Sequence, residues 1–424
     1  MTRQMKNSGV EWIGDIPEKW KTGKLRHLAR LKTGNTPSKE NGDLYYEGGI
    51  FLWIKPEDLN AFSPVLKTKE KLNELGLEFA RNVPPYTPLV CCIGSIGKYG
   101  VSDQIACFNQ QINAVIFNEV FIDKKYGLYY ISSQKEQHLF YANGNVVKIL
   151  NTEGQGNIVF PIPPLSEQKA IADYLDAKCA KIDDFIVKQK TVIEKLKEYK
   201  QSVITEAVTK GLNPAAPMKT SGVEWIGDIP EKWNVRKLFQ VFTQVKNKNQ
   251  GMVETNLLSL SYGKIRQKNI ETSFGLLPES FETYNIIDKN DIVLRLTDLQ
   301  NDQKSLRVGL STQRGIITSA YVTMRAKNPH MASYLYYLLH TFDIEKGFYG
   351  MGDGVRQGLN WDELKHLSFV LPSLSEQKKI ADYLDKKCAE IDSLIEKKQQ
   401  FLTELATYKK SLIYEYVTGK KEIV

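Results

Sequence analysis

The chain contains two stretches of sequence that each occur twice, in the same order. SGVEWIGDIPEKW occupies Ser8–Trp20 and recurs without change at Ser221–Trp233, an offset of 213 residues. LSEQKAIADYLDAKCAKID occupies Leu165–Asp183 and recurs at Leu374–Asp392 with 16 of 19 positions identical, an offset of 209. The segments between these repeats, 21–160 and 234–370, have almost no similarity to each other. The 424 residues therefore predict one framework built twice, with different content in each copy.

Each copy of the second repeat is expected to open a long amphipathic helix. Ser166 and Ser375 follow prolines and are suited to N-cap positions, and Glu167 and Glu376 place negative charge in the first turn. Positions spaced mostly by three and four residues then form a heptad-like seam. In the first helix this seam comprises Ile171, Leu175, Cys179, Ile182, Ile186, Gln189, Ile193, Leu196, Lys200, Val203 and Ala207. In the second it comprises Ile380, Leu384, Cys388, Ile391, Ile395, Lys398, Leu402, Leu405, Lys409, Leu412 and Tyr416.

Helices of this length, ~60 Å at 1.5 Å per residue, need a partner for their apolar stripe. The simplest partner for each is the other. We favour an antiparallel, pseudo-twofold coiled coil over a parallel pair, because duplicated halves commonly pack with twofold symmetry. Antiparallel pairing sets Cys179 near Lys409 and away from Cys388, so the two matched cysteines are expected to fill the core and not to form a disulfide.

The variable segments are predicted to be mixed α/β, which makes the fold class α+β. Runs typical of strands are GIFLWI, PLVCCIG, QINAVIF, DIVLRLT and AYVTMRA, separated by Gly, Asn and Pro turns, and short helices are expected at 124–139 and 331–341. We place one globular domain at 1–160, a helical region at 161–213, a second globular domain at 214–370 and a second helical region at 371–424. The repeated tryptophans are assigned to framework packing or partner contact; these are Trp12, Trp20, Trp225 and Trp233.

Composition narrows the class of protein further. The net charge of +8 and the 42% hydrophobic content suit a globular protein and are compatible with a polyanionic partner, without identifying one. Apolar runs such as TPLVCCI and SYLYYLL fall short of the ~18 residues that a membrane-spanning helix needs. Five cysteines without a CxxC pair fit reduced thiols, and the first residues lack the pattern of an export signal. We therefore expect a cytoplasmic protein without a membrane segment.

Motifs of catalysis are weak or incomplete in this sequence. The five histidines, His27, His138, His330, His340 and His366, have no metal-binding spacing, and no proline is followed by aspartate as a PD-(D/E)xK nuclease requires. FYGMG at 348–352 fits a methyl-donor motif only formally, and in NVPPY at 82–86 a valine stands where a methyltransferase needs Asn or Asp. GSIGKYG at 94–100 is shorter than a phosphate loop and is interpreted as a tight turn, with contact to DNA phosphates as the alternative.

The duplicated pattern PPLSEQKAIADYLDAKCAKID, followed by a long helix and preceded by SGVEWIGDIPEKW, resembles the specificity subunit of Type I restriction-modification enzymes. TGNTPSKENGDLYYEGGIFLWIKPEDL, GIITSAY and GMGDGVRQGLNWDELKHL add similarity to target recognition domain motifs. The resemblance covers essentially the whole chain. It implies two target recognition domains, each reading one half of a bipartite, asymmetric sequence in double-stranded DNA.

The resemblance also implies partners that carry the chemistry. Two methylation subunits would dock on the helices, and two restriction subunits would complete the nuclease. Adenine N6 methylation with S-adenosylmethionine and DNA cleavage with ATP and Mg²⁺ would then belong to these partners, with no cofactor and no catalysis in this chain. Two alternatives stay open. One is a recognition subunit for a fused methyltransferase-nuclease, and the other is a coiled-coil scaffold that binds proteins and not DNA.

Candidate DNA contacts follow from the side chains that distinguish bases: Arg or Lys for guanine, and Asn or Gln for adenine. In the first domain the candidates are Thr36, Ser38, Lys39, Lys55, Ser95, Lys98, Asn109, Gln110 and Gln111. In the second they are Tyr262, Lys264, Arg266, Arg295, Arg307, Arg314, Ser319, Arg356 and Gln357.

Overall fold

The structure is a computed structural model that describes residues 3–40, 43–268, 278, 280–299, 306–351 and 358–423. The chain divides into two compact units. Unit 1 is formed by 1–189 together with 400–424, and unit 2 by 190–399. Each unit thus contains one globular part and one end of each long helix, whereas the boundaries expected from the sequence assign each helix to a region of its own. Within the described residues, no helix combines the length and apolar character needed to span a membrane.

Unit 1 contains two four-stranded sheets, with strand orders β6-β5-β10-β7 and β4-β11-β8-β9, and the two-stranded pairs β1-β2 and β12-β3. β5 and β10 run parallel, and the other paired strands of this unit are antiparallel. The strands are β1 Met5–Asn7, β2 Asp15–Pro17, β3 Lys21–Lys24, β4 Ala29–Thr33, β5 Phe51–Ile54, β6 Lys71–Leu72, β7 Asn82–Val83, β8 Leu89–Cys91, β9 Tyr99–Gly100, β10 Ala106–Phe108, β11 Ile112–Phe117 and β12 Val159–Ile162. The short helices are α1 Leu25–Leu28, α2 Glu74–Phe79, α3 Lys124–Ser133, α4 Lys135–Phe140 and α5 Thr152–Gly156.

Unit 2 has one four-stranded antiparallel sheet, β16-β23-β20-β21, and the two-stranded pairs β13-β14, β15-β24, β17-β18 and β19-β22. Its strands are β13 Met218–Thr220, β14 Asp228–Pro230, β15 Asn234–Lys237, β16 Phe242–Gln244, β17 Leu258–Ser261, β18 Lys264–Gln267, β19 Asn285–Ile287, β20 Ile292–Leu294, β21 Val308–Leu310, β22 Gly315–Ile317, β23 Val322–Ala326 and β24 Ser368–Leu371. Its short helices are α7 Leu238–Val241, η1 Gln250–Met252, η2 Pro329–Met331, α8 Ala332–Ile344, η3 Gly347–Gly350 and α9 Trp361–Leu364. The mixed α/β content expected of both variable segments is confirmed, and the predicted strands contain β5, β8, β11, β20 and β23. The helix expected at 124–139 covers α3 and all of α4 except its last residue, whereas α8 continues three residues beyond the helix expected at 331–341.

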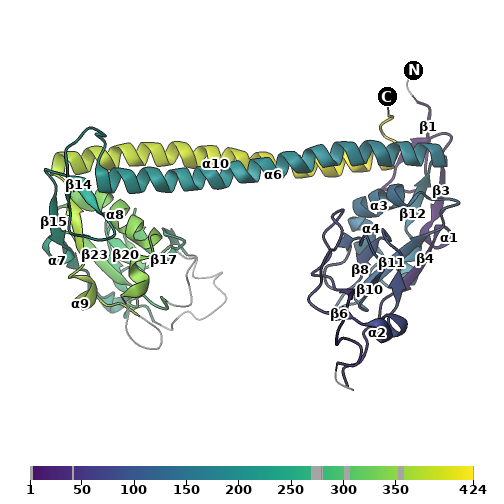
Figure 1. The fold of residues 1–424 in the computed structure, drawn as a ribbon, viewed down its shortest axis with the longest axis horizontal. Coiled ribbons are helices and arrows are strands. Elements are labelled where there is room, and N and C mark those ends of the chain that lie inside the picture. Colours follow the sequence, from purple (N-terminus) through teal and green to yellow (C-terminus); the bar gives the residue numbers. More distant parts are fainter. Residues whose placement is uncertain are drawn as a thin grey trace. The chain divides into compact units, whose positions relative to one another are not determined.

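The two long helices, α6 (Leu165–Lys210) and α10 (Leu374–Val417), pair in antiparallel fashion (Figure 1). In unit 1 the first part of α6 packs against the last part of α10, and Ile171 and Leu175 share a core with Leu412. In unit 2 the last part of α6 packs against the first part of α10, and Ile204 and Ala207 share a core with Ile380. The predicted antiparallel pairing is thus confirmed within each unit.

Both helices start two residues earlier than the predicted N-caps imply. Both begin at a leucine, so the predicted caps Ser166 and Ser375 lie inside the first turn. In α10 the cap is Ser373, whose Oγ accepts a hydrogen bond from the backbone N–H of Glu376 at 3.3 Å. The capping oxygen must stand before the first helical residue, and Ser373 occupies that position directly after Pro372.

Contacts between the helices recur in both units with the roles of α6 and α10 exchanged. The Lys409 ammonium of α10 binds the Asp183 carboxylate of α6 at 2.6 Å in unit 1. In unit 2, Lys200 of α6 binds Asp392 of α10 at 2.6 Å. Each residue of the second pair lies 209 positions from its counterpart in the first, on the other helix. This exchange is the contact pattern of an antiparallel, pseudo-twofold coiled coil.

The cysteines at the matched positions lie in the core of their own units. Cys179 and Cys388 are both buried and neither forms a disulfide. Burial raises the pKa of the Cys179 thiol, and the Lys409 ammonium partly offsets this effect; in unit 2, Lys200 acts in the same way on Cys388. The expected position of Cys179 beside Lys409 is therefore confirmed.

A tyrosine in each variable segment fastens the globular part of its unit to the helices. The Tyr126 hydroxyl of α3 donates to the carbonyls of Pro161 and Val417, at 2.9 and 3.0 Å. In unit 2 the Tyr334 hydroxyl of α8 contacts the carbonyls of Val208 and Val370, at 3.1 and 3.3 Å. The variable segments therefore share a framework helix that sequence comparison did not reveal.

The repeated tryptophans occupy equivalent places in the two units. Trp20 and Trp233 are almost completely buried, with 0% and 1% of their surface exposed. The Trp20 indole donates to the Glu167 carboxylate of α6 at 3.0 Å. Trp12 packs against Tyr141, and Trp225 packs against Phe342, with ring centroids 6.3 and 4.9 Å apart. Framework packing thus explains why the tryptophans repeat.

A buried histidine makes unit 1 sensitive to acid. His138 of α4 is fully buried, neither ring nitrogen has a partner in the described protein, and burial lowers its pKa to about 4. Because the unfolded pKa is near 6.5, this group's contribution is complete above pH ~6.5 and is lost as the pH falls through about 4. Between pH ~6.5 and 4 the unfolding free energy of the parent should therefore decrease more than that of His138→Leu, by about 3 kcal/mol. Urea unfolding at a series of pH values measures this difference in free energy, with a substitution of an exposed histidine, His27→Gln, as control. If the free energies of His138→Leu and the parent changed equally with pH, the role of His138 in acid sensitivity would be contradicted.

Candidate nucleic-acid interface

The candidate residues of unit 1 gather where the parallel strands β5 and β10 end. Lys55 directly follows β5 and Asn109 directly follows β10, and the Asn109 N–H donates to the Ile54 carbonyl at 3.0 Å. The segment carrying Thr36 passes beside them, because Asn35 donates to the Phe108 carbonyl at 3.1 Å. At Gly34 a Cβ would lie 2.2 Å from the Phe108 carbonyl oxygen, so only glycine permits this close approach. We call this region the unit 1 edge.

Amide and hydroxyl side chains at the unit 1 edge bind one another. The Thr36 hydroxyl donates to the Gln110 side-chain oxygen, and both residues are exposed. Asn109 is only 6% exposed, and its amide donates to the Gln111 side chain at 3.1 Å. Asn109 therefore positions Gln111, while Thr36 and Gln110 are the members whose polar atoms face solvent.

Two candidate lysines of this edge share one carboxylate. Lys39 forms an ion pair with Glu70, and Lys55 binds the same carboxylate at 2.6 Å. Hydrogen bonds from Lys39 and then Lys55 lower the pKa of Glu70 to about 2, so this carboxylate stays ionised at neutral pH. The lysines also lie over aromatic rings, Lys39 over Tyr46 and Lys55 over Trp53, at 4.5 and 4.6 Å from the ring centroids. A surface pocket opens here, lined by Lys39, Asp43, Tyr46, Glu47, Gly49, Thr68, Lys69, Glu70 and Lys71.

Removal of the shared carboxylate is expected to strengthen binding of any DNA duplex. Glu70→Gln leaves Lys39 and Lys55 without their common counter-charge, so both become available to phosphates. We expect on the order of tenfold tighter binding of a random duplex at ~0.1 M salt and a steeper salt dependence. Glu47→Gln removes a carboxylate from the same pocket that forms no ion pair within the described residues, and should have the smaller effect. Equal gains from both substitutions would mean that net charge alone, and not the release of the lysines, controls affinity.

The remaining candidates of unit 1 border the edge. The Lys98 ammonium donates to the backbone carbonyls of Pro56 and Glu57, which follow β5. Gly94 and Gly97 have φ values of +76° and +79°, and Ser95 lies exposed between them. The tight turn expected of GSIGKYG is confirmed, and a contact with phosphates stays a prediction. Ser38 is exposed beside Lys39, and its hydroxyl accepts a hydrogen bond from the Glu40 N–H at 3.1 Å.

Three candidates of unit 2 lie on one β-hairpin, formed by β17 and β18. Ser259 pairs with Arg266 and Ser261 with Lys264, while Tyr262 stands in the connecting turn with 75% of its surface exposed. Neither Lys264 nor Arg266 has a carboxylate within ion-pair distance among the residues that the structure describes. This hairpin therefore presents cationic side chains that no described carboxylate of unit 2 pairs with.

The other unit 2 candidates are dispersed. Arg314 binds the carboxylates of Glu254 and Asp288 at 3.2 and 2.7 Å, and Ser319 is exposed after β22. Arg295 is half-buried after β20, and its N–H donates to the Arg307 carbonyl at 2.9 Å. Arg356 and Gln357 lie outside the described residues.

Arg307 has the environment of a structural residue and not of a DNA contact. Its side chain has 0% exposure. The guanidinium donates to the backbone carbonyls of Arg295, Thr297 and Asp298, at 2.9 to 3.2 Å. Because a buried charge needs such partners, Arg307 holds the ends of neighbouring strands together. We therefore correct its placement and leave it out of the interface.

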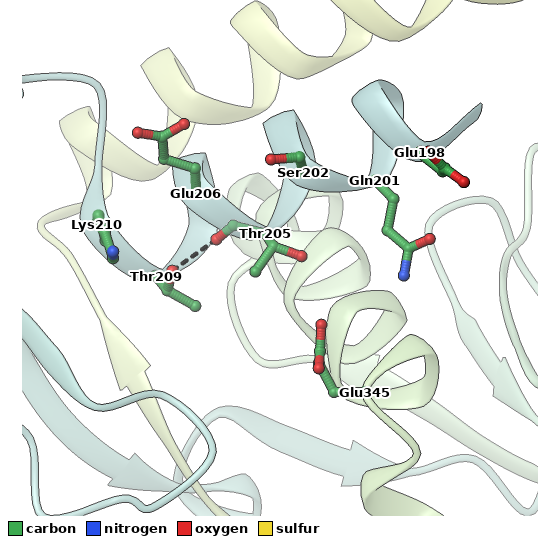
Figure 2. A pocket seen from close by; sticks show the side chains of 8 residues that line it. All are labelled: Glu198, Gln201, Ser202, Thr205, Glu206, Thr209, Lys210 and Glu345. Carbon is green, nitrogen blue, oxygen red and sulfur yellow. Dashed lines mark hydrogen bonds between the residues drawn. The ribbon is translucent and has the colours of Figure 1, made fainter. Parts of the chain in front are cut away.

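A pocket on α6 in unit 2 has the wrong charge for DNA. Figure 2 shows its lining by Glu198, Gln201, Ser202, Thr205, Glu206, Thr209 and Lys210 of α6 and by Glu345 at the end of α8. Three carboxylates against one ammonium would repel phosphates. Thr209 turns its hydroxyl to the Thr205 carbonyl, at 2.6 Å, and so is engaged within the helix.

The described residues contain no group of three or more His, Cys, Asp and Glu side chains that could hold a metal ion. Of the near-miss motifs, NVPPY includes β7, and Phe348 of FYGMG is completely buried against Phe342, with ring centroids 4.8 Å apart. Phe348 therefore belongs to the core of unit 2.

Several residues of the candidate interface were missed by the sequence analysis. Glu70, Lys69 and Lys71 line the unit 1 pocket, and no motif distinguished them from other surface charges. Ser259 and Ser261 could have been found, because LSLSYGKIRQK alternates apolar and polar residues about a Tyr-Gly turn, which is the pattern of a hairpin.

Comparison with known proteins places the whole chain in one family. The family model described as "Type I restriction modification DNA specificity domain" matches residues 17–195 and 230–404. The putative type I restriction enzyme MjaX specificity subunit of Methanocaldococcus jannaschii is 24% identical, covering 96% of this chain and 95% of its own length. The StySPI specificity subunit of Salmonella potsdam is 23% identical, covering 96% of this chain and 90% of its own length.

Solved structures agree at the level of the fold. One, described as the structural basis underlying complex assembly and conformational transition of the type I R-M system, has a TM-score of 0.68 at 14% identity and covers 96% of this chain and 99% of its own. The HsdS subunit from Thermoanaerobacter tengcongensis has a TM-score of 0.51 at 14% identity, with coverage of 96% and 98%. The duplicated framework, its two dissimilar globular parts and these matches agree: the chain belongs to the family of Type I restriction-modification specificity subunits.

Proposed function

We propose that each unit of this chain reads one half of a bipartite, asymmetric sequence in double-stranded DNA. The observation that carries this proposal is the contrast between framework and content. The framework contacts recur at fixed offsets in both units, whereas the exposed polar residues differ: amides, hydroxyls and lysines at the unit 1 edge, and a cationic hairpin in unit 2. Because the two units share a framework but expose different polar residues, each can recognise a different half-site.

The chemistry is proposed to reside in partner subunits in the cytoplasm. Two methylation subunits would transfer a methyl group from S-adenosylmethionine to adenine N6, and two restriction subunits would use ATP and Mg²⁺ for cleavage. Flipping of the target adenine would be done by the methylation subunit. This chain would supply sequence recognition and hold no cofactor itself.

The long helices are the proposed docking surface for the methylation subunits. Outside the seam they expose large apolar side chains, including Phe185 and Tyr199 on α6 and Leu394 and Tyr408 on α10, which are 41%, 50%, 48% and 55% exposed. Because large exposed apolar patches mark protein contacts, we propose that these side chains contribute to such a patch on each helix. We further propose that the length of the helices sets the spacer between the half-sites.

A salt titration of duplex binding by the purified complex tests the proposal. Phosphate contacts release counterions, so affinity should fall steeply as the logarithm of the salt concentration rises. The target duplex should also bind more tightly than a random duplex at every salt concentration. A flat curve without preference for the target would support a protein-binding scaffold and contradict recognition of DNA.

A further inference from the structure

The turn of the β17–β18 hairpin holds an aromatic residue in an unfavourable backbone conformation. Tyr262 has a φ of +47°, and Gly263 follows with +74°. A two-residue hairpin turn with positive φ at both positions favours Asn, Asp or Gly, and for a bulky side chain such a φ is an outlier. Tyr262 occupies the first of these positions with 75% of its surface exposed.

The surrounding structure keeps this turn in place. The Gly263 N–H donates to the Leu306 carbonyl at 3.2 Å. A Cβ at position 263 would lie 3.0 Å from the Leu306 Cβ and the φ is positive, so a side chain at the second turn position would be strained. The hydrogen bond and close contact of Gly263 with Leu306 thus tie the turn that contains Tyr262 to the rest of unit 2.

The hairpin is also anchored along its length by its inner face. Leu258 and Leu260 are 2% and 7% exposed and belong to a small core with Ile287, Val293 and Ile317. At Gly309 of β21 a Cβ would lie 2.5 Å from the Leu260 side chain, so the hairpin rests directly on that strand. The inner face of the hairpin is therefore buried within unit 2, and only the outer face and the turn are open to a ligand.

The outer face has the composition of a DNA-reading ribbon. The cross-strand pairs Ser259–Arg266 and Ser261–Lys264 point to the same side, because paired residues of antiparallel strands share a face. This side carries two cations, two hydroxyls and no carboxylate. A two-stranded ribbon fits the major groove of B-form DNA. There Arg and Lys bind guanine, and Ser hydroxyls can form hydrogen bonds with the edges of several bases.

We infer that the β17–β18 hairpin enters the major groove of the half-site read by unit 2 and that Tyr262 contacts base edges there. This inference rests on the proposed function. Among the described residues the Tyr262 side chain forms no hydrogen bond that would offset this strain, and strain of this kind is typical of ligand-binding positions. Arg266 and Lys264 discriminate bases beside it, and the side chain of Tyr262 sets the preference at the base step that the turn reaches.

The inference predicts opposite changes in stability and recognition. Tyr262→Asn places a residue suited to a positive φ at the turn, so the urea midpoint of the chain should stay equal or rise. In the assembled methylation complex, preference within the half-site of unit 2 should fall at least tenfold at one or two adjacent base pairs. Affinity for a random duplex should stay within twofold. Base preference is measured by competition against duplexes randomised in one half-site at a time.

Two further variants sharpen this experiment. Met252→Asn changes another exposed residue of unit 2 with positive φ, +53°, away from the hairpin, and should leave every base preference unchanged. Arg266→Gln should relax one base pair adjacent to those affected by Tyr262→Asn.

Four results would overturn the inference. Tyr262→Asn could keep base preferences within twofold of the parent, could lower the urea midpoint, or could alter the preference in the other half-site. As the fourth result, Tyr262→Asn could fail to assemble with the methylation partner, which would identify the turn as a protein contact. In each case a parent complex that still prefers its target with a steep salt dependence would show that the proposed function stands. A parent without that preference would reject the proposed function itself.

Discussion

A chain in which a relative's domain replaces residues 21–160 is expected to recognise a target altered in one half only. The exchanged segment begins and ends on the paired strands β3 and β12, whose register sets Lys21 opposite Ile162. Both junctions therefore fall on one small sheet of the framework. The unit 1 edge lies within the exchanged residues and the unit 2 hairpin lies outside them, so one set of base contacts should be replaced completely.

The exchange will succeed only if the incoming domain keeps the framework contacts of α3. Tyr126 donates to the Val417 carbonyl of α10, and Tyr129 donates to the Asp176 carboxylate of α6 at 2.7 Å. A donor domain should therefore be chosen with tyrosines at both positions. Loss of the Tyr126 hydroxyl would leave two buried carbonyls without a donor, at ~1–3 kcal/mol each.

Sequencing of methylated adenines in a host that carries the hybrid complex measures the result. One half of the modified sequence should change, while the other half and the spacer stay as in the parent. The reciprocal exchange of 234–370 is the matched control, and it should change the opposite half. Simultaneous change of both halves in either hybrid would refute recognition by two independent units.

Insertion of one heptad into each of α6 and α10 is expected to lengthen the permitted spacer. Seven residues add ~10 Å of helix, which corresponds to up to ~3 base pairs. Insertion between Gln189 and Lys190 and between Gln399 and Gln400 leaves the contacts within each unit in place, because these are the boundaries of the units. A heptad also preserves the seam, so Ile193 and Leu196 keep their facing positions.

Modification of duplexes with graded spacers measures the effect. The doubly extended chain should prefer longer spacers and keep both half-sites. A heptad inserted into α6 alone serves as control, since it leaves α10 without a matching turn and should weaken assembly at every spacer length. If the doubly extended chain preferred the same spacer as the parent, helix length would not determine the spacer.

The framework could be predicted from the sequence because duplication made it visible. The seam, the antiparallel pairing and the burial of Cys179 and Cys388 follow from repeated residues at fixed offsets. Both helices were expected, but their equivalence was not, because α3 and α8 have few residues in common beyond their tyrosines. Tyr126 and Tyr334 satisfy backbone carbonyls from distant segments, and such long-range hydrogen bonds leave no local pattern.

The interface was predicted less well, because its side chains were chosen by type alone. Thr36 and Gln110 are close together because the backbone of Asn35 binds the Phe108 carbonyl at the end of β10, a long-range contact that no local rule revealed. Arg307 was misplaced because a charged residue is ordinarily exposed, whereas here carbonyls of a neighbouring strand end surround it. The pairing of Lys39 and Lys55 through Glu70 likewise depends on the tertiary fold.

Unit 2 is built from one continuous segment of the chain and unit 1 from two, and this difference determines which unit is translated completely first. Unit 2 is a single continuous stretch, 190–399, so its parts have all been translated before residue 400 is added. Unit 1 needs residues 400–424, including the Val417 carbonyl that receives the Tyr126 hydroxyl. During synthesis, unit 1 can therefore be completed only after all of unit 2 has been translated. A stop codon near residue 400 would leave unit 2 complete and would remove part of unit 1.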